Sequence, residues 1–305
     1  MKTLIQITLI FVAIILLSCK STQHVPFSKA EVTKEDFIKV DDYNNQSVIV
    51  SQVVDRRIKY LPRMPWRSIG KNMNNGENGI CWTTSVEDKM YMSGDDILDS
   101  SFAVIDYFNP KNAQRDLMVD LKMWIYEITP SGDIVQRELK KNEIKRERLN
   151  DSISRISLNI DKDILKGKML LRKYTLLSPY YNIDRLYSIE RQVDVAIIEP
   201  WLFQYSIPLL FGKYDIYIPK GELYTSKRLK NRIVVLGDGD INIVHNDESI
   251  DVDRIINSHN SYRGTEIRRG DKEVERITAT VQNVMPLKAG SNEQPLGIKI
   301  ERSPY

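Results

Sequence analysis

Residues 213–219 read Lys213-Tyr214-Asp215-Ile216-Tyr217-Ile218-Pro219, and they give the clearest fold signal in the chain. Tyr214, Ile216 and Ile218 occupy every second position, so an extended backbone places them on one face. Alternation of this kind is typical of a strand whose sheet has one buried face. Pro219 ends the predicted strand.

Segments of similar composition recur on both sides of this strand. They are rich in β-branched and aromatic residues, have the length of strands and are separated by turn residues. Upstream they span residues 47–54, 102–108, 117–128, 169–177 and 187–198. The others span residues 201–210, 232–236, 241–245, 274–281 and 296–300.

The turn residues predict how these strands connect. Residues 130–133 (Pro-Ser-Gly-Asp) and 237–240 (Gly-Asp-Gly-Asp) lie between strand-like segments, as hairpin turns do. No long segment of helical period alternates with the strands, which argues against a parallel sheet built from βαβ units. The expected fold class is therefore all-β, an antiparallel β-sandwich with a few short helices.

Short helices and loops account for the rest of the chain. A helix is expected near residues 28–40, with Ser28 as a cap, and at best a short one within residues 83–95. The charged residues 137–149 predict a short helix or a hairpin arm with a solvated face. Residues 70–78 are rich in asparagine and glycine and predict a long flexible loop, and residues 249–271 are a second polar stretch.

The first residues are typical of a targeting signal. Lys2 provides a positive charge, and the apolar run over residues 5–17 is too short for a comfortable membrane span. Leu16-Leu17-Ser18-Cys19 then follows the lipobox pattern of bacterial lipoproteins. We expect residues 1–18 to be removed and Cys19 to be acylated; the alternative is an ordinary secretory signal in which Cys19 is incidental.

Composition limits the classes of partner and fold. The formal net charge is +3, and basic and acidic residues are interspersed, which argues against a nucleic-acid surface. If Cys19 is acylated, Cys81 has no cysteine partner in the chain, which excludes a disulfide-stapled fold. Residues 19–46 are polar and predict a tether, followed by one β domain over residues 47–305.

Several stretches follow one another in the order of a known sequence pattern. After the turn at residues 129–133 come Ile156-Ser157-Leu158-Asn159-Ile160, residues 165–174 (Leu-Lys-Gly-Lys-Met-Leu-Leu-Arg-Lys-Tyr) and Leu177-Ser178-Pro179-Tyr180. The most specific pair is residues 201–209 (Trp-Leu-Phe-Gln-Tyr-Ser-Ile-Pro-Leu) and residues 214–219.

These stretches resemble the envelope-protein family called domain of unknown function 3857, a β-rich module that commonly precedes a transglutaminase-like domain. Weaker similarity reaches residues 102–107 and 276–284, so the resemblance covers about residues 100–285. After Val284 too few residues remain for the catalytic domain that usually follows in that family. The resemblance therefore implies a stand-alone module.

Cys81 is a candidate nucleophile. Gly79-Ile80-Cys81-Trp82 resembles the nucleophile region of transglutaminase-like and papain-like thiol enzymes. Such a thiol needs a histidine to accept its proton. Only His24, His245 and His259 exist. A structural cysteine is the favoured interpretation, since buried cysteines commonly behave as small hydrophobic residues.

Metal, cofactor and glycan sites have weaker support. Asp238-Gly239-Asp240-Ile241-Asn242 has the acidic spacing that opens a calcium loop but lacks the later glycine, so a turn is favoured and no metal is expected. No nucleotide, zinc or redox motif occurs, and no cofactor is expected. Trp66, Trp82 or Tyr181 could stack on a carbohydrate if exposed, although large apolar groups usually lie in a core.

The sequence thus predicts a non-catalytic binding or scaffolding lipoprotein, held at a bilayer by acylated Cys19, with an envelope protein or a glycan as partner and no nucleic acid. The alternative is a thiol enzyme centred on Cys81, or an accessory subunit of a separate transglutaminase-like enzyme. Lys20 follows Cys19 where an inner-membrane retention signal would have Asp. We therefore expect an outer-membrane protein that faces the periplasm.

Overall fold

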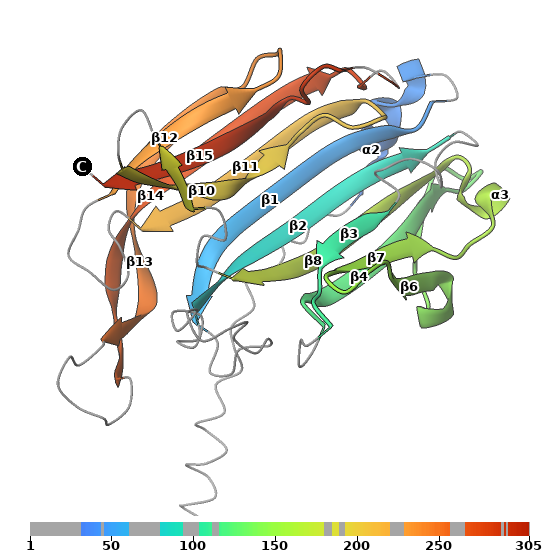
Figure 1. Ribbon diagram of the computed structural model, residues 1–305. Coiled ribbons are helices and arrows are strands. Elements are labelled where there is room, and N and C mark those ends of the chain that lie inside the picture. The colour runs from blue at the N-terminus through green and yellow to red at the C-terminus, as the bar shows by residue number, and fades with distance from the viewer. Residues whose placement is uncertain are drawn as a thin grey trace, which may run out of the picture. The chain divides into compact units, whose positions relative to one another are not determined.

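The computed structural model describes residues 32–43, 46–60, 80–93, 104–111, 116–179, 185–188, 193–219, 229–256, 266–287, 290 and 292–304. These residues belong to one compact unit, Glu31–Tyr305. Strands dominate it, and they form three sheets of eight, four and three strands (Figure 1). The all-β fold class is confirmed.

The eight-stranded sheet contains the predicted strand over residues 213–218. Its order is β13 (Asn242–Ile256), β14 (Glu266–Val284), β11 (Leu209–Pro219), β1 (Val48–Tyr60), β2 (Ile80–Met92), β8 (Lys168–Pro179), β4 (Met118–Ile128) and β5 (Ile134–Glu138). All neighbouring pairs are antiparallel except β1 and β11, which run parallel. A parallel pair needs a long connection, and here about half of the chain lies between the two strands.

Two smaller sheets cover one face of the large sheet. The four-stranded sheet has the order β12 (Leu229–Leu236), β15 (Gly297–Pro304), β10 (Val193–Leu202) and β9 (Arg185–Ser188). The three-stranded sheet has the order β3 (Ile105–Phe108), β7 (Ile153–Leu158) and β6 (Ile144–Arg148). We call the covered side the inner face; it carries Tyr214, Ile216 and Ile218, all buried in the main core, as the alternation predicts.

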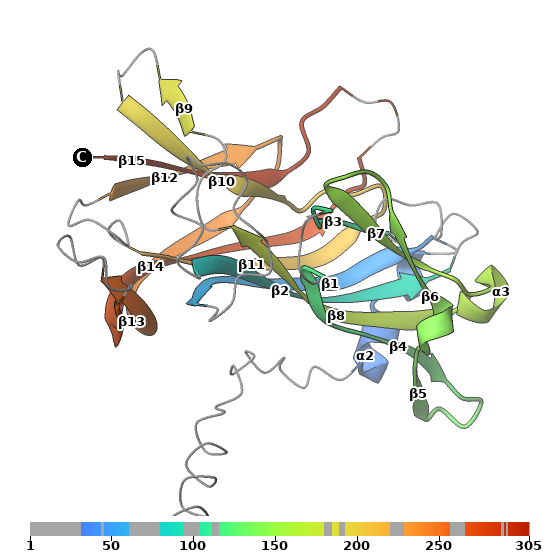
Figure 2. The same ribbon diagram turned by 60° about the horizontal axis from the view of Figure 1, so that its bottom comes forward.

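The opposite side, the outer face, is partly covered by the N-terminal segment. Helix α2 (Lys34–Ile38) lies on the other side of the large sheet from β3 and β7 (Figure 2). Thr33 caps it through a reciprocal bond with Asp36. Val32, Phe37 and Val40 are buried in a second core with strand residues such as Val48 and Leu171. Residues 32–40, part of the stretch that the sequence predicts as a tether, thus pack against the sheet. The helix is shorter than residues 28–40, and Ser28 lies outside the described residues.

Three other expectations differ from the structure. Residues 83–92 form β2 and not a helix. Residues 201–210 are not one strand: β10 ends at Leu202, β11 begins at Leu209, and the link carries the chain from one sheet to another. The turn at residues 237–240 is not a hairpin, because β12 and β13 belong to different sheets.

Other turns and arms follow the expectations more closely. Residues 130–133 form the β4–β5 hairpin turn, in which Gly132 has a φ of +83°. Residues 137–149 form an exposed arm that contains the end of β5, a 3₁₀ turn (Lys141–Glu143) and β6. Within the polar stretch at residues 249–271, residues 249–256 and 266–271 are paired strands of the β13–β14 hairpin. Within the described part of the chain, no helix is both long and apolar enough to cross a membrane.

Candidate functional site

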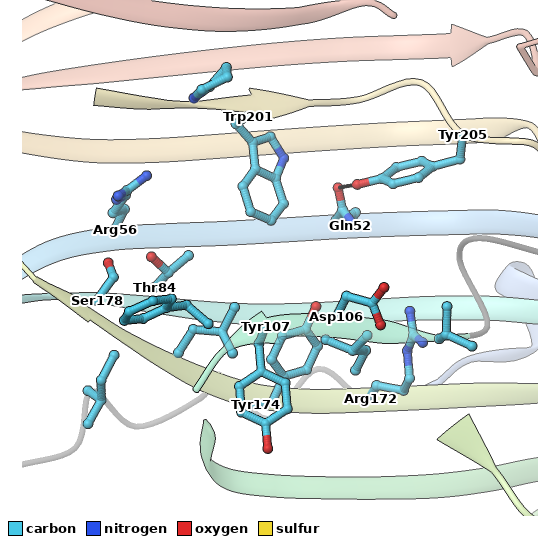
Figure 3. Close-up of a pocket in the computed structure, with 16 residues that line it drawn as sticks. Gln52, Arg56, Thr84, Asp106, Tyr107, Arg172, Tyr174, Ser178, Trp201 and Tyr205 are labelled. Atoms are coloured by element: carbon cyan, nitrogen blue, oxygen red, sulfur yellow. Dashed lines mark hydrogen bonds between the residues drawn. The ribbon is translucent and has the colours of Figure 1, made fainter. Parts of the chain in front are cut away.

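A cavity of about 280 Å³ lies over the inner face of the large sheet. Strands β1, β2 and β8 form its floor, and β3, β10 and the link after β10 form its walls. Ten of the lining side chains are labelled in Figure 3. Ligand pockets in proteins have volumes of roughly 300–1,000 Å³, so this cavity has room for a small ligand or a chain end.

The strand register arranges the floor in three parallel rows. Within each row the residues are direct cross-strand partners on β1, β2 and β8, and they alternate with outward residues along each strand. The rows are Gln52–Asp88–Arg172, Val54–Val86–Tyr174 and Arg56–Thr84–Leu176. Polar rows therefore flank a row that is largely apolar.

The first row contains a buried ion pair. Nε of Arg172 donates to Oδ1 of Asp88 at 2.7 Å, and Nη2 donates to Oδ2 at 3.1 Å. The side chains are only 2% and 0% exposed. Complete burial raises the pKa of the Asp88 carboxyl, and the charge of Arg172 opposes this effect. The pair places a guanidinium at the cavity floor with its charge already balanced.

The third row brings a second arginine to the cavity. Arg56 is 5% exposed, and its guanidinium lies 5.2 Å from the centre of the Trp82 ring, a distance typical of a cation–π contact. Thr84, 6% exposed, is its direct cross-strand neighbour. The Trp82 ring thus helps to fix the orientation of a cationic group that lines the cavity.

Trp201, at the end of β10, supplies the wall opposite this floor (Figure 3). Its ring stacks on Tyr214 with the centroids 5.6 Å apart and the planes 6° apart. Its Nε1 is buried and has no hydrogen-bond partner among the described residues. A buried N–H without an acceptor costs free energy, so this donor favours a bound acceptor.

Tyr205, in the link after β10, closes the wall beside Trp201. Its hydroxyl donates to Oε1 of Gln52 at 2.9 Å (Figure 3). Burial raises the pKa of the Tyr205 phenol above its ordinary value, and it does the same for Tyr174 on the floor. Both phenols therefore stay protonated at physiological pH and can act as hydrogen-bonding groups but not as bases.

Strand β3 forms the remaining wall through Ile105, Asp106, Tyr107 and Phe108. Burial and a hydrogen bond with Asp116 raise the pKa of Tyr107 to about 12. Asp106 accepts two hydrogen bonds of 2.7 Å from Arg155 of β7. The carboxylate on this wall is therefore already matched with a cation.

Taken together, these side chains can hold a ligand by stacking and hydrogen bonding. Guanidinium, indole N–H and hydroxyl donors surround a partly apolar space. Such a set fits a ligand that has a polar, acceptor-rich end and an apolar part. Among the residues that line the cavity there is no cysteine or histidine.

The predicted thiol site is not assembled between Cys81 and His245. Cys81 lies in β2, is 0% exposed and packs against Leu117 and Leu177. His245 lies in β13 and bonds with Glu275 at 2.8 Å. In register, His245 is separated from Thr84 of β2 by four strand-to-strand steps, or roughly 19 Å at about 4.8 Å a step. His24 and His259 lie outside the described residues.

The other predicted site residues fall into two groups. Cys19, Trp66 and Tyr181 lie outside the described residues. Trp82 is 4% exposed and belongs to the core, as the favoured interpretation predicts. Asp238 and Asp240 lie exposed in the turn between β12 and β13. Within the described ranges, no group of three or more His, Cys, Asp or Glu residues could hold a metal ion.

Sequence reasoning missed Gln52, Arg56, Thr84 and Arg172 as site residues. One pattern in the sequence points to Thr84 and to Asp88, the partner of Arg172. Alternate residues of β2 are all buried on one face, namely Trp82, Thr84, Val86, Asp88 and Met90. This alternation was not recognised because residues 87–89 are all charged. Charged residues in the middle of a strand argue against a buried strand unless their ion-pair partners are known.

Comparisons with known proteins add little to this geometry. No family model matches the chain, and no curated protein matches it. The resemblance to the domain of unknown function 3857 family therefore stays a prediction. A solved structure from Parabacteroides distasonis ATCC 8503, described as a "putative protease", is similar with a TM-score of 0.44 and 10% identity. The alignment covers 84% of this chain and 40% of that protein, so this chain spans less than half of its length.

Proposed function

We propose that this protein is an envelope lipoprotein, anchored through acylated Cys19 to the outer membrane, whose β domain binds part of an envelope protein or glycan in the cavity without turnover. Acyl chains suit this role because each buried methylene contributes about 0.8 kcal/mol, so two or more chains hold a domain at a bilayer. The domain then acts by contact at the membrane surface.

The observation that carries the binding proposal is the buried Nε1 of Trp201. The Trp201 side chain lines the cavity, and its Nε1 has no hydrogen-bond acceptor among the described residues. The same cavity is lined by Thr84 and Arg56 on its floor and by Tyr205 on the wall beside Trp201 (Figure 3). Donors collected in a partly apolar space are characteristic of binding sites.

A non-catalytic role is supported by the chemistry of the lining. The phenols of Tyr107, Tyr174 and Tyr205 have raised pKa values and do not serve as bases near neutral pH. The thiol of Cys81 is buried in a central strand, far from the imidazole of His245. These facts favour binding over the alternative of a thiol enzyme.

Thermal unfolding with product analysis tests the binding role. The full-length acylated protein, purified in detergent, is heated with soluble peptidoglycan fragments and with peptides, and the mixtures are then analysed by mass spectrometry. We expect a ligand to raise the Tm of the wild type but not of Trp201→Leu, with the ligand mass unchanged. Trp124→Leu is the matched control, because Trp124 packs on the outer face.

Two results would refute this role. The first is a change in ligand mass that requires the protein, which would indicate an enzyme. The second is an equal Tm rise in the wild type and in Trp201→Leu, which would place binding outside the cavity.

Membrane fractionation tests the anchor separately. In cells fed a clickable palmitate analogue, the wild type should be labelled and should sediment with membranes, whereas Cys19→Ala should be unlabelled and should leave the membrane fraction. Cys81→Ala is the matched control and should behave as the wild type. Unchanged sedimentation of Cys19→Ala would contradict the lipid anchor.

A further inference from the structure

Helix α2 presents an apolar side chain to the outside of the domain. Phe37 is buried in the second core, but its neighbour Ile38 is 65% exposed. No other large apolar side chain in the described helices and strands is as exposed. A large apolar side chain in water forgoes the free energy of burial, so Ile38 favours a contact beyond the domain.

The β4–β5 hairpin extends this apolar surface. Lys34 is one helical turn from Ile38, and its Nζ lies 3.9 Å from the position of a Cβ on Gly132 in the hairpin turn. Ile128, just before this turn, is 42% exposed. Its direct cross-strand partner is Ile134, which packs against the second core. Ile38 and Ile128 therefore both lie on the outer face, beside the same turn (Figure 2).

Aromatic side chains lie on the same face. Tyr43, Tyr91 and Trp124 are partly buried against the second core that α2 covers. Tyrosine and tryptophan rings of this kind, which combine an apolar body with a polar group, are concentrated at membrane–water interfaces. We call Ile38, Ile128 and these three aromatic residues the α2 patch.

The charges beside the α2 patch have both signs. Lys34 and Lys39 are exposed, and so are Glu35, Asp41 and Asp42. A partner surface of one charge sign therefore finds no complementary field here. A zwitterionic lipid headgroup carries both signs, and lysine side chains can extend from an apolar surface to its phosphate.

The size of the α2 patch and its distance from the anchor favour a lipid surface over a protein. A stable protein interface buries about 800 Å² on each partner, which is more than two exposed isoleucines and three partly buried rings supply. A bilayer contact needs less area, because the acyl chains on Cys19 supply the membrane affinity. Val32, the first described residue, follows Cys19 by 13 residues, which span at most roughly 45 Å.

We propose that the α2 patch lies on the bilayer that holds Cys19. Ile38 and Ile128 enter the headgroup region, and the aromatic rings lie at its surface. Helix α2 and the cavity are on opposite faces of the large sheet (Figure 2), so the sheet separates the bilayer from the cavity. The cavity then lies on the side away from the membrane. This inference rests on the lipid anchor of the proposed function and adds the orientation of the domain.

Fluorescence quenching at single positions tests this orientation. The variants are Ile38→Cys, Ile128→Cys and, as the control, Val235→Cys in β12, where Val235 is 45% exposed in the sheet that covers the inner face. Each is labelled with the thiol-reactive dye NBD. Acylation of Cys19 and complete burial of Cys81 restrict the label to the new thiol. The acylated proteins are reconstituted into phosphatidylcholine vesicles with and without lipids that carry a doxyl quencher near the headgroup end of the acyl chain.

The labels at positions 38 and 128 should lose at least about half of their emission to the quencher, because interfacial elements lie about 5–10 Å deep in the headgroup region. The label at position 235 should keep its emission. Adding Ile38→Asp to Ile128→Cys should reduce the quenching at position 128. Adding Val244→Asp, at a residue 43% exposed in β13, should not.

The outcomes separate this inference from the proposed function. Equal quenching at positions 38, 128 and 235, or none at positions 38 and 128 in a protein that floats with the vesicles, overturns the inference and leaves the anchor intact. Equal effects of Ile38→Asp and Val244→Asp also overturn it. If the protein carries no acyl chain and does not float with the vesicles, the anchor and the inference both fail.

Discussion

Arg172 donates two hydrogen bonds to Asp88 on the inner face of the large sheet, and both side chains are almost completely buried. The pair joins β2 to β8 at the end of the cavity that holds Gln52. Because burial of an ion without its counterion is costly, the cavity floor depends on both residues being present.

Asp88→Ala should destabilise the protein strongly, by about 3–5 kcal/mol, because it leaves the Arg172 guanidinium buried without its counterion. The free energy of unfolding in urea measures this loss. The double variant Asp88→Leu, Arg172→Met removes both charges and should be much closer to the wild type. If Asp88→Ala were as stable as the wild type, the burial of the Arg172 guanidinium would not depend on Asp88.

Gly212 should tolerate no side chain. It faces Gln52 across the β1–β11 pair, and a Cβ there would lie 2.7 Å from Cγ2 of Val281 and 2.8 Å from Cδ1 of Phe203. Gly212→Ala should therefore cost roughly 1–3 kcal/mol through overpacking. Adding Phe203→Leu to Gly212→Ala should recover part of this loss. If the two substitutions changed the free energy of unfolding in urea additively, the predicted contact between the new Cβ and Phe203 would be contradicted.

Asp215, on the outer face, should make the free energy of unfolding depend on pH in the acid range. Partial burial raises the pKa of Asp215, but hydrogen bonds from Lys213, Thr278 and Arg276 outweigh it and hold the pKa below its ordinary value of 3.8. A carboxyl with a lowered folded-state pKa adds stability above its unfolded-state pKa and loses it as the pH falls through the folded-state value.

Asp215→Asn should therefore lower stability at pH 7 and lessen the loss of stability between about pH 4 and pH 2. Thermal unfolding across this range provides the measurement. Asp133→Asn in the exposed β4–β5 turn is the control and should follow the wild-type profile. If the stability of Asp215→Asn and of the wild type fell in parallel as the pH is lowered, Asp215 would not be a source of the acid sensitivity.

The fold class was predictable because local patterns carry it. Tyr214, Ile216 and Ile218 alternate in sequence and are all buried on the inner face. Strand β2 was missed because Glu87, Asp88 and Lys89 stand in its middle. Each is matched by a residue distant in sequence, namely Lys173 at 3.0 Å, Arg172 at 2.7 Å and Asp36 at 2.9 Å, and no local pattern reveals such partners.

The cavity was less predictable than the fold. Arg56, Thr84 and Leu176 come together only through the register of β1, β2 and β8, and register is set by the whole sheet. Trp201 begins the most specific stretch of the family resemblance, but its place in the cavity wall depends on where β10 ends. The alternative of a nucleophile at Cys81 came from a motif of four residues, which carries no information on the sheet position that buries this side chain.

The indole N–H signal of Trp201 tests the central claim most directly. The chain has four tryptophans, so a ¹⁵N-labelled sample gives at most four indole signals, and Trp201→Phe identifies the one of interest. On titration with soluble peptidoglycan fragments, this proton signal should move downfield as Nε1 gains an acceptor, with the signal of Trp124 on the outer face nearly unchanged. A Trp201 signal that stays fixed while a ligand binds would contradict a binding site in this cavity.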